Sequence, residues 1–371
     1  MVRVGVLLNP IAGFGGTLAL HGTDRLPAHL FDEAVRAGRA ARRLVRALDQ
    51  LGSPGGEVEL IAGPGVLGAD ALCDAGIGHV VLDMPVRPGR TTSADMARAA
   101  HLLVAEGVDL LVFAGGDGTA TDLAESIGEV VPVIGVPAGV KMHSEVFARS
   151  PEAAGRLLVA AAAGHASVEP AEVLDVGDGG ESGVVGMLRV PRSHEPLQGA
   201  KTAAPAAASA AVGRAIAESL VLAADPRTTW IIGPGATTGA VAAALGLDPT
   251  LRGVDVRHPD GSVETDVTEE RLFAVVGAAE HPLLVLGVVG GQGFLLGRGN
   301  QQLSARVVSA IGAERVHILA TEEKVGALFP PVLLIDIEPD EVRGTHPLLG
   351  YRRVRTGPRQ STVLRVVDAA A

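Results

Sequence analysis

The sequence is poor in aromatic residues and cysteine, and both shortages limit the classes of protein to which it can belong. Aromatic residues make up 2% of the 371 residues, so a core must be built from Ala, Val, Leu and Ile, within a hydrophobic content of 47%. A single cysteine, Cys73, excludes a disulfide framework within the chain and suits a reducing compartment. We expect Cys73 to be a small core residue.

Long apolar runs are missing as well. Val2–Leu8 is too short for the apolar region of a signal peptide. Pro282–Gly297 falls short of the ~18 residues of a membrane span and contains several glycines. The formal net charge is −11, and no basic stripe interleaved with aromatic residues stands out, which argues against nucleic acid or a membrane as partner. We therefore predict a cytoplasmic protein that acts on small molecules, and we expect it to be a homo-oligomer.

Apolar strands alternate with amphipathic helices over residues 1–165. Strands are expected at Arg3–Leu8, Val58–Ala62, Leu110–Phe113 and Val131–Val136, with helices at Asp32–Leu51 and Ser93–Glu106. This alternation predicts βαβ units, hence an α/β fold with a parallel sheet covered by helices. Beyond Gly164 the expected elements are mixed and richer in strand, beginning with Glu172–Val176 and Val184–Val190, so a second domain is predicted there.

The most informative motif is Gly115-Gly116-Asp117-Gly118-Thr119, between a buried strand and a helix. Three glycines let backbone N–H groups approach a phosphate closely, and the helix start adds partial positive charge. Asp117 would repel such a ligand unless it binds Mg²⁺ or takes a proton from an attacking hydroxyl, and both uses describe phosphoryl transfer. The alternative is a tight turn that needs Gly-Asp-Gly for its backbone angles.

Lysine and asparagine are the other scarce residues, with 28 Arg but only three Lys and two Asn. All five lie in or beside loops rich in Gly, Ser or Thr: Lys141, Lys201, Lys324, Asn9 and Asn300. Lys141 follows a predicted strand and can neutralise phosphate charge, and His143 can face the same crevice. The alternatives are chance placement for the lysine and a structural or surface role for the histidine.

Two further loops follow predicted strands. Asn9-Pro10 and the glycines after it, including Gly13, Gly15 and Gly16, lie at the end of the first strand, where open α/β sheets bind ligands. A flexible connection is the alternative. Gly233–Thr238 lies between a strand and a helix and suits either a second anion-binding turn or an ordinary loop with Thr as the cap.

Gly290–Gln302 combines five glycines with Gln292, Arg298, Asn300 and Gln301 among apolar strand residues. Buried amides need hydrogen-bond partners, which a sugar or a base edge offers, and an arginine can clamp a phosphate. The alternative is a satisfied hairpin network at a subunit interface. Asp175, Asp178, Asp255 and Asp336 are interpreted as turn or surface acids without a role.

These motifs resemble the superfamily of NAD kinases, diacylglycerol and sphingosine kinases and phosphofructokinases. More narrowly, the chain is similar to the NAD-kinase-like group that includes the acetoin-catabolism X proteins and predicted ATP- or polyphosphate-dependent NAD kinases. The resemblance covers nearly the whole chain, and its most group-specific block is 290–302. The other motifs that carry it are Asn9–Gly16, His21–Asp24, Gly115–Thr119, Gly139–Ser144 and Gly233–Thr238.

The resemblance implies three parts: a Rossmann-like nucleotide- and phosphate-binding domain over 1–165, a β-rich acceptor-binding domain over 166–329, and a C-terminal segment, 330–371, that returns to the first domain. It implies ATP or polyphosphate as donor, with Mg²⁺, and Asp117 as general base or Mg²⁺ ligand. Phosphate and nucleotide contacts are expected from Asn9, Gly13, Gly15, Gly16, Gly115, Gly116, Gly118, Thr119 and Lys141. Acceptor contacts are expected from His143, Gln292, Arg298, Asn300 and Gln301.

The expected acceptor is the 2′-hydroxyl of NAD, giving NADP. NAD kinases resemble one another in an Asn-Glu pair that holds the dinucleotide, and this sequence has no Asn-Glu. Either Asn300 and the glutamines beside it replace that pair, or the acceptor is another alcohol. A small polyol or hydroxyketone is then the first alternative and a lipid the second. A non-catalytic dinucleotide-binding regulator on the same fold is the rival from another class.

Overall fold

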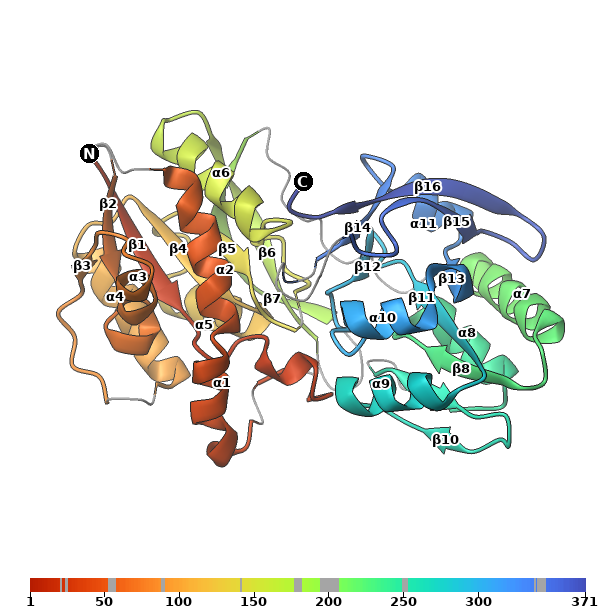
Figure 1. Cartoon of the computed structure of the whole chain (residues 1–371). Coiled ribbons are helices and arrows are strands. Elements are labelled where there is room, and N and C mark those ends of the chain that lie inside the picture. The colour runs from red at the N-terminus through yellow and green to blue at the C-terminus, as the bar shows by residue number, and fades with distance from the viewer. Residues whose placement is uncertain are drawn as a thin grey trace. The chain divides into compact units, whose positions relative to one another are not determined.

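A five-stranded sheet and a nine-stranded sheet organise the chain in the computed structural model (Figure 1). The structure describes residues 1–20, 22–23, 26–52, 58–87, 91–140, 142–176, 182–193, 207–248, 253–336, 338 and 345–371. The chain divides into two compact units. The first comprises Met1–Gly15, Gly22–Ala200 and Ala370, and the second comprises Gly16–His21, Lys201–Ala369 and Ala371.

The sheet of the first unit is entirely parallel, in the order β3-β2-β1-β4-β5. Its central strands are continuous apolar runs because helices cover both faces of the sheet. The strands are β1 (Val2–Leu8), β2 (Val58–Ala62), β3 (Val80–Val81), β4 (Leu110–Gly115) and β5 (Val133–Pro137). This confirms the α/β, Rossmann-like first domain.

Helix α2 packs against α6 on one face of this sheet, and α4 packs against α5 on the other (Figure 1). The helices of the unit are α1 (Phe31–Ala37), α2 (Arg39–Leu48), α3 (Ala69–Asp74), α4 (Ser93–Ala105), α5 (Asp117–Ile127) and α6 (Pro151–Ala162). The single helix expected over Asp32–Leu51 is divided at Gly38, whose φ of 57° ends α1 in the left-handed region. Cys73, expected in the core, is exposed on α3.

A separate antiparallel ribbon belongs to the first unit, although it was expected in the second domain. It consists of β6 (Ser167–Val176) and β7 (Ser182–Arg192). Both strands contact α5, and Ala171, Val173, Leu188 and Val190 join the hydrophobic core of the first unit. Burial of these four side chains keeps the ribbon with the first sheet.

The second unit has a mixed sheet in the order β10-β9-β8-β11-β13-β15-β16-β14-β12. Its strands are β8 (Thr228–Ile232), β9 (Asp255–Arg257), β10 (Val263–Glu264), β11 (His281–Gly287), β12 (Phe294–Leu296), β13 (Val316–Leu319), β14 (Val332–Ile335), β15 (Gly350–Arg355) and β16 (Ser361–Asp368). Its helices are α7 (Ala207–Ala223), α8 (Ala236–Ala244), α9 (Glu269–Ala278), α10 (Ala305–Ile311) and α11 (Glu322–Gly326). Short 3-10 turns occur at Phe14–Gly16, Ala28–Leu30, Asp49–Leu51, Gly65–Leu67 and Ala313–Arg315.

The C-terminal strands complete this second sheet. We expected 330–371 to return to the first domain, but β16 lies between β15 and β14, and β15 pairs with β13. Backbone hydrogen bonding therefore holds the segment in the second unit. Among the described residues, no helix has the length and apolar character needed to cross a membrane.

Candidate functional site

The order of the first sheet creates a switch point between β1 and β4, because the chain moves outward in one direction from β1 and in the other from β4. Open α/β sheets bind ligands at the carboxyl ends of the strands at such a point. Here those ends are Asn9, directly after β1, and Gly116, directly after β4. The motifs singled out from the sequence therefore meet at the position that the topology favours.

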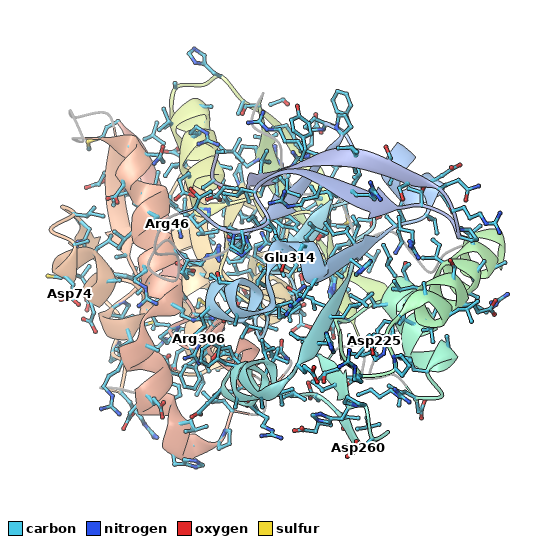
Figure 2. The ribbon with its side chains drawn as sticks, turned by 45° about the vertical axis from the view of Figure 1, so that its right-hand side comes forward. Arg46, Asp74, Asp225, Asp260, Arg306 and Glu314 are labelled. Atoms are coloured by element: carbon cyan, nitrogen blue, oxygen red, sulfur yellow. The ribbon has the colours of Figure 1, made fainter. Side chains whose placement is uncertain are left out.

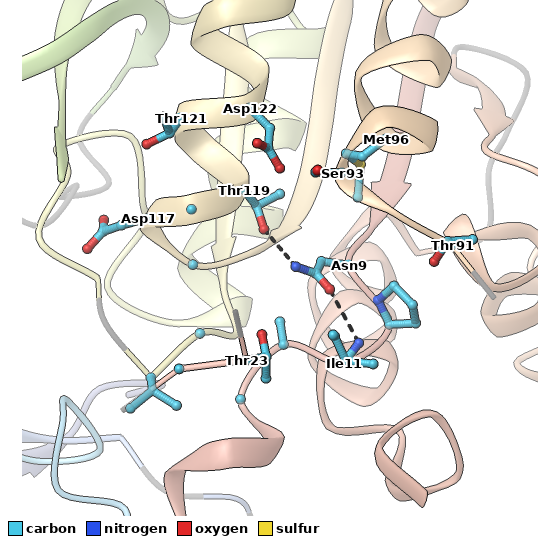
Figure 3. A pocket seen from close by; sticks show the side chains of 18 of the residues that line it. Asn9, Ile11, Thr23, Thr91, Ser93, Met96, Asp117, Thr119, Thr121 and Asp122 are labelled. Atoms are coloured by element: carbon cyan, nitrogen blue, oxygen red, sulfur yellow. Dashed lines mark hydrogen bonds between the residues drawn. The ribbon is translucent and has the colours of Figure 1, made fainter. Parts of the chain in front are cut away.

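Asn9 fixes the loop after β1 to the start of α5 (Figure 3). Its Nδ2 donates to Oγ1 of Thr119 at 3.0 Å, and its Oδ1 accepts from the backbone N–H of Ile11 at 3.3 Å. Its backbone N–H donates to the carbonyl of Ala114 at 2.9 Å. Asn9 thus uses its backbone and both side-chain atoms to hold the loop geometry.

Two glycines allow loops to approach one another here. A Cβ at Gly13, whose φ is 80°, would lie 2.4 Å from the carbonyl oxygen of Ala138, and one at Gly115 would lie 2.5 Å from Oγ1 of Thr119. Neither distance is compatible with a side chain. The loops after β1 and β5 consequently pack backbone to backbone at Gly13, and Gly115 leaves room for the side chain of Thr119.

The N-terminus of α5 has no side-chain cap. Gly116 is the N-cap residue, and the first helical hydrogen bond runs from the N–H of Ala120 to the carbonyl of Gly116. The N–H groups of Asp117, Gly118 and Thr119 consequently lack an acceptor within the helix, as at any helix start. Free N–H groups and the helix dipole together favour a bound anion.

A cavity of about 510 Å³ lies against these loops (Figure 3). Apolar side chains and hydroxyls line part of it: Phe31, Leu67, Met96, Thr91, Thr92 and Ser93. Gly116, Gly118 and Thr119 line it together with Asn9, Gly13 and Val140, and Asp117, Asp122 and Asp175 add carboxylates. The cavity thus combines a surface suited to phosphates with one suited to a less polar group.

The carboxylate of Asp117 is buried, with 4% of the residue exposed, and hydrogen-bonded to the loop after β5. Its Oδ1 accepts from the N–H of Ser144 at 3.0 Å, from Oγ of Ser144 at 2.7 Å and from the N–H of His143 at 2.9 Å. Its Oδ2 also accepts from the N–H of His143, at 2.8 Å, and lies 3.0 Å from Nδ1 of the same histidine. In Figure 3 this carboxylate points away from Asn9.

A divalent cation at this cavity would need ligands from water or substrate in addition to those of the protein. Among the described residues, no group of three His, Cys, Asp or Glu side chains could hold a metal ion. Mg²⁺, however, usually takes one or two carboxylates and completes its shell with water and substrate phosphates. The carboxylates that line the cavity fit that mode of binding, and they do not fit a metal site made only of protein.

The expected site residues are distributed unevenly. The cavity is lined by Asn9, Gly13, Gly116, Asp117, Gly118 and Thr119, whereas Gly115 supports the loop beneath, and Gly15 does not line the cavity. Gly16 belongs to the second unit, where its Cα packs against Gln301, since a Cβ there would lie 2.9 Å from that side chain. His143 contacts Asp117 and does not line the cavity. Lys141 lies outside the described residues.

The block 290–302 is bonded to its own unit. Asn300 accepts from the N–H of Gly297 at 2.9 Å and donates to the carbonyl of Leu295 at 2.7 Å. Arg298 pairs with the buried Asp336 and stacks on Phe294, with its Cζ 4.1 Å from the ring centroid. Gln301 donates to the carbonyl of Gly297 at 3.3 Å, and Gln292 is buried with 5% exposed. These contacts tie much of the block to its own unit, although Oε1 of Gln301 is buried without a hydrogen-bond partner among the described residues, and Asp336 has a structural role that the sequence did not suggest.

Sequence reasoning overlooked several residues that line the cavity or support it. Ser144 received no role, although it supplies two of the donors to Asp117. Asp122 and Asp175, the hydroxyls of Thr91, Thr92 and Ser93, and the apolar residues Phe31, Leu67 and Met96 also line the cavity. The one sequence feature that could have pointed to these cavity residues is the run Thr91-Thr92-Ser93 before α4, where Thr92 forms a capping box with Asp95.

Gly233–Thr238, considered from the sequence as a second anion-binding turn, forms hydrogen bonds within its own loop and to α11. Oγ1 of Thr238 donates to the carbonyl of Gly235 at 2.8 Å, and Oγ1 of Thr237 accepts from Nζ of Lys324 at 2.9 Å. These bonds close the start of α8 onto its own loop and onto α11.

Residues 73–166 match the family of the ATP-NAD kinase N-terminal domain. This stretch runs from α3 to the end of α6 and includes β4, the loop Gly115–Thr119 and Ser144. No curated protein and no solved structure matches the chain. The family match confirms the resemblance to the NAD-kinase-like superfamily and supports a kinase with small-molecule substrates.

Proposed function

We propose that this protein is an ATP-dependent kinase that transfers the γ-phosphate of ATP to a hydroxyl group, with the 2′-hydroxyl of NAD as the acceptor. The observation that carries the proposal is the uncapped N-terminus of α5 beside the buried carboxylate of Asp117, both at the cavity on the switch point. One feature attracts phosphate and the other can organise a proton or a cation, and phosphoryl transfer uses both.

The phosphates of the donor would lie against the N–H groups at the start of α5 and against the loop Asn9–Gly13. Thr119 is held by Asn9, so its N–H keeps a fixed direction. Phe31, Leu67 and Met96 suit the base or sugar of a nucleotide, because they offer apolar surface beside hydroxyls. Lys141, which lies outside the described residues, is the expected additional cation for the phosphates.

Mg²⁺ bound to the phosphates would be held by carboxylates of the cavity, Asp122 and Asp175 together with the expected ligand Asp117. The cation supplies charge neutralisation of the phosphates as the transition state develops. Asp117 is closely bonded to Ser144, so this carboxylate also has the rigidity that a positioning group needs.

The proton of the acceptor hydroxyl would pass to the pair formed by Asp117 and His143. Nδ1 of His143 lies 3.0 Å from Oδ2 of Asp117, although the two atoms do not have hydrogen-bond geometry. Oδ1 accepts from Ser144 and from the N–H of His143, whereas the structure gives Oδ2 one donor, the N–H of His143, so Oδ2 keeps the greater capacity to take a proton.

A small polyol or hydroxyketone is the second candidate for the acceptor. Asn300 bonds the backbone of Gly297 and Leu295 and so is poorly suited to replace the missing Asn-Glu pair. The second unit therefore offers less support for a dinucleotide than the sequence suggested, whereas the donor side of the proposal is unaffected.

The test measures ADP release with Mg²⁺ and ATP for NAD, NADH, glycerol and acetoin, in parallel with an NADP-specific dehydrogenase readout. NADP formed from NAD supports the full proposal. ADP release with a small alcohol and none with NAD would refute the NAD acceptor and retain the kinase. No transfer from either ATP or polyphosphate to any acceptor would favour the non-catalytic regulator.

A further inference from the structure

The hairpin formed by β15 and β16 carries a charge opposite to that of the whole chain. From Gly350 to Asp368 the hairpin contains five arginines and a single acid, Asp368 at the end of β16, whereas the net charge of the chain is −11. The arginines are Arg352, Arg353, Arg355, Arg359 and Arg365. Net charge alone hides this cluster, because acids elsewhere in the sequence outnumber it.

The antiparallel register places part of this cluster on one face of the sheet. Tyr351 pairs with Arg365, and Arg353 pairs with Val363. Side chains alternate along a strand, and Val354, next to Arg353, and Leu364, between Val363 and Arg365, are buried in the core of the second unit. The face of Tyr351, Arg353, Val363 and Arg365, which we name the outer hairpin face, is exposed, with Tyr351 71% and Val363 60% exposed.

The arginines of the hairpin have no acidic partners. Within the part of the chain that the structure describes, none of the five forms an ion pair, although several arginines elsewhere on the surface do. Arg227, for example, pairs with Asp225 and Glu280. Among the described residues, Arg352 is held by the carbonyls of Tyr351 and Pro347, and the structure gives no side-chain hydrogen bond for the other four. An acidic protein has thus left a group of cations uncompensated on one face.

The position of the hairpin in the sheet limits what can cover this face. β15 lies between β13 and β16, and β16 lies between β15 and β14, so neither is an edge strand, although β15 pairs with β13 only at Val354 and Arg355 and β16 pairs with β14 only over Arg365–Asp368. Only short stretches of backbone are therefore open to an added peptide strand. A second copy placed by two-fold symmetry would set the arginines against one another, at a cost in repulsion.

The outer hairpin face also exposes the single tyrosine of the chain between arginines. Directly opposite residues on a sheet have Cβ atoms about 5 Å apart, so the side chains of Tyr351 and Arg365 start as neighbours on this face. A planar aromatic surface among cations is the combination that binds single-stranded nucleic acid, because bases stack on the ring and phosphates meet the guanidinium groups. A membrane would demand more exposed apolar surface than Tyr351 and Val363 offer.

We propose that the outer hairpin face, together with Arg359 in the turn between β15 and β16, binds single-stranded nucleic acid, with Arg353, Arg359 and Arg365 on phosphates and Tyr351 stacked on a base. The net charge does not oppose this, because charges farther away than the Debye length, about 10 Å at 0.1 M salt, are screened. This face is basic and carries an aromatic residue, so the proposal departs from the expectation, drawn from the whole sequence, of no nucleic-acid partner. The binding is separate from the kinase reaction proposed above.

The test is fluorescence anisotropy with a fluorescein-labelled single-stranded RNA of about 20 nucleotides, and the matching DNA, over a series of salt concentrations. Arg353→Gln/Arg365→Gln should weaken binding and reduce the slope of log K against log salt by about 1.4, since each phosphate contact on a single strand contributes about 0.7. Tyr351→Ala should weaken binding about 5- to 100-fold with little change in slope.

Arg227→Gln/Arg271→Gln is the matched control, because both arginines are exposed and paired in the same unit. It should bind like the wild type, and all variants should keep the wild-type thermal midpoint and kinase activity. Absence of binding by the wild type at low salt would overturn the proposal. A loss of affinity in Arg227→Gln/Arg271→Gln as large as that in Arg353→Gln/Arg365→Gln would overturn it as well. Capture by phosphatidylserine vesicles without RNA binding would also overturn it, in favour of a lipid surface.

Discussion

The hydroxyl of Ser144 donates to Oδ1 of Asp117 at 2.7 Å, joining the loop after β5 to the first residue of α5. The same Oγ accepts from the N–H of Leu174 on β6 at 3.0 Å. One buried side chain therefore ties together the phosphate loop, the neighbouring loop and the ribbon. The carboxylate at the centre of the proposed chemistry is fixed by residues far from it in sequence.

We predict that Ser144→Ala lowers both stability and turnover. It removes a donor from the buried Asp117 and an acceptor from the N–H of Leu174, and a buried group left unsatisfied costs about 1–3 kcal/mol. Urea unfolding and steady-state kinetics measure the two effects. Ser126→Ala, which removes a hydroxyl from α5 bonded only to the carbonyl of Leu123, is the control and should change little. Wild-type turnover in folded Ser144→Ala would argue against a positioning role.

Asp117→Asn should reduce turnover by about 10²–10⁴-fold, the contribution of general acid–base catalysis, while ATP still binds. The amide keeps the size of the carboxylate but loses its charge and one acceptor. Single-turnover kinetics and equilibrium binding of ATP separate the two quantities. Glu125→Gln removes an exposed carboxylate from the same helix and should leave both unchanged. Turnover close to that of the wild type would remove Asp117 from the reaction.

We predict that Arg298→Ala destabilises the fold and leaves ATP affinity unchanged in the folded protein. Arg298 and Asp336 are both buried, with side chains 4% and 3% exposed, so the change deprives a buried carboxylate of a cationic partner, at about 3–5 kcal/mol. Arg306→Ala is a matched control, since Arg306, labelled in Figure 2, also pairs with a carboxylate and stacks on a phenylalanine. Its side chain, however, is 54% exposed. It should cost about 1 kcal/mol or less. A specific loss of ligand affinity in Arg298→Ala would restore this residue to the binding site.

The free energy of unfolding should decrease as pH is lowered, because of His346. The residue is 2% exposed, and burial, together with the nearby charge of Arg352, lowers the pKa of His346 from 6.5 to about 4. Between these values the unfolded chain binds more protons than the folded chain, so the free energy of unfolding decreases as pH falls from 6.5 to 4. The full decrease is about 3 kcal/mol. Above pH 6.5 this group contributes no pH dependence.

Urea unfolding at pH 7 and pH 4.5 measures this contribution. His346→Gln retains polar atoms that can accept from the N–H of Leu348 but does not titrate, so it should lose less stability between the two pH values than the wild type. Burial also lowers the pKa of His317, which adds a contribution of the same sign. An identical pH dependence in wild type and His346→Gln would assign the effect to other groups.

Local patterns in the sequence were sufficient for the first sheet and the phosphate loop. The apolar runs of β1, β4 and β5 predict buried parallel strands, since only strands covered on both faces can be apolar throughout. Gly115–Thr119 directly follows one of these runs, so its place at a strand–helix junction required no knowledge of distant contacts. The break at Gly38 escaped this reasoning because apolar spacing continues across it.

Contacts between distant residues could be decided only by the tertiary structure. Arg298 and Asn300 are as polar as ligand-binding residues, and only the structure shows that Arg298 bonds Asp336, 38 positions away, and that Asn300 bonds the backbone of its own loop. The cavity draws Asp122 and Asp175 from α5 and β6, and the register of β15 and β16 brings Tyr351 and Arg365 together. Sequence therefore determined which elements form and where the phosphate loop starts. Sheet order and register, which depend on pairing across the whole chain, determined which side chains meet.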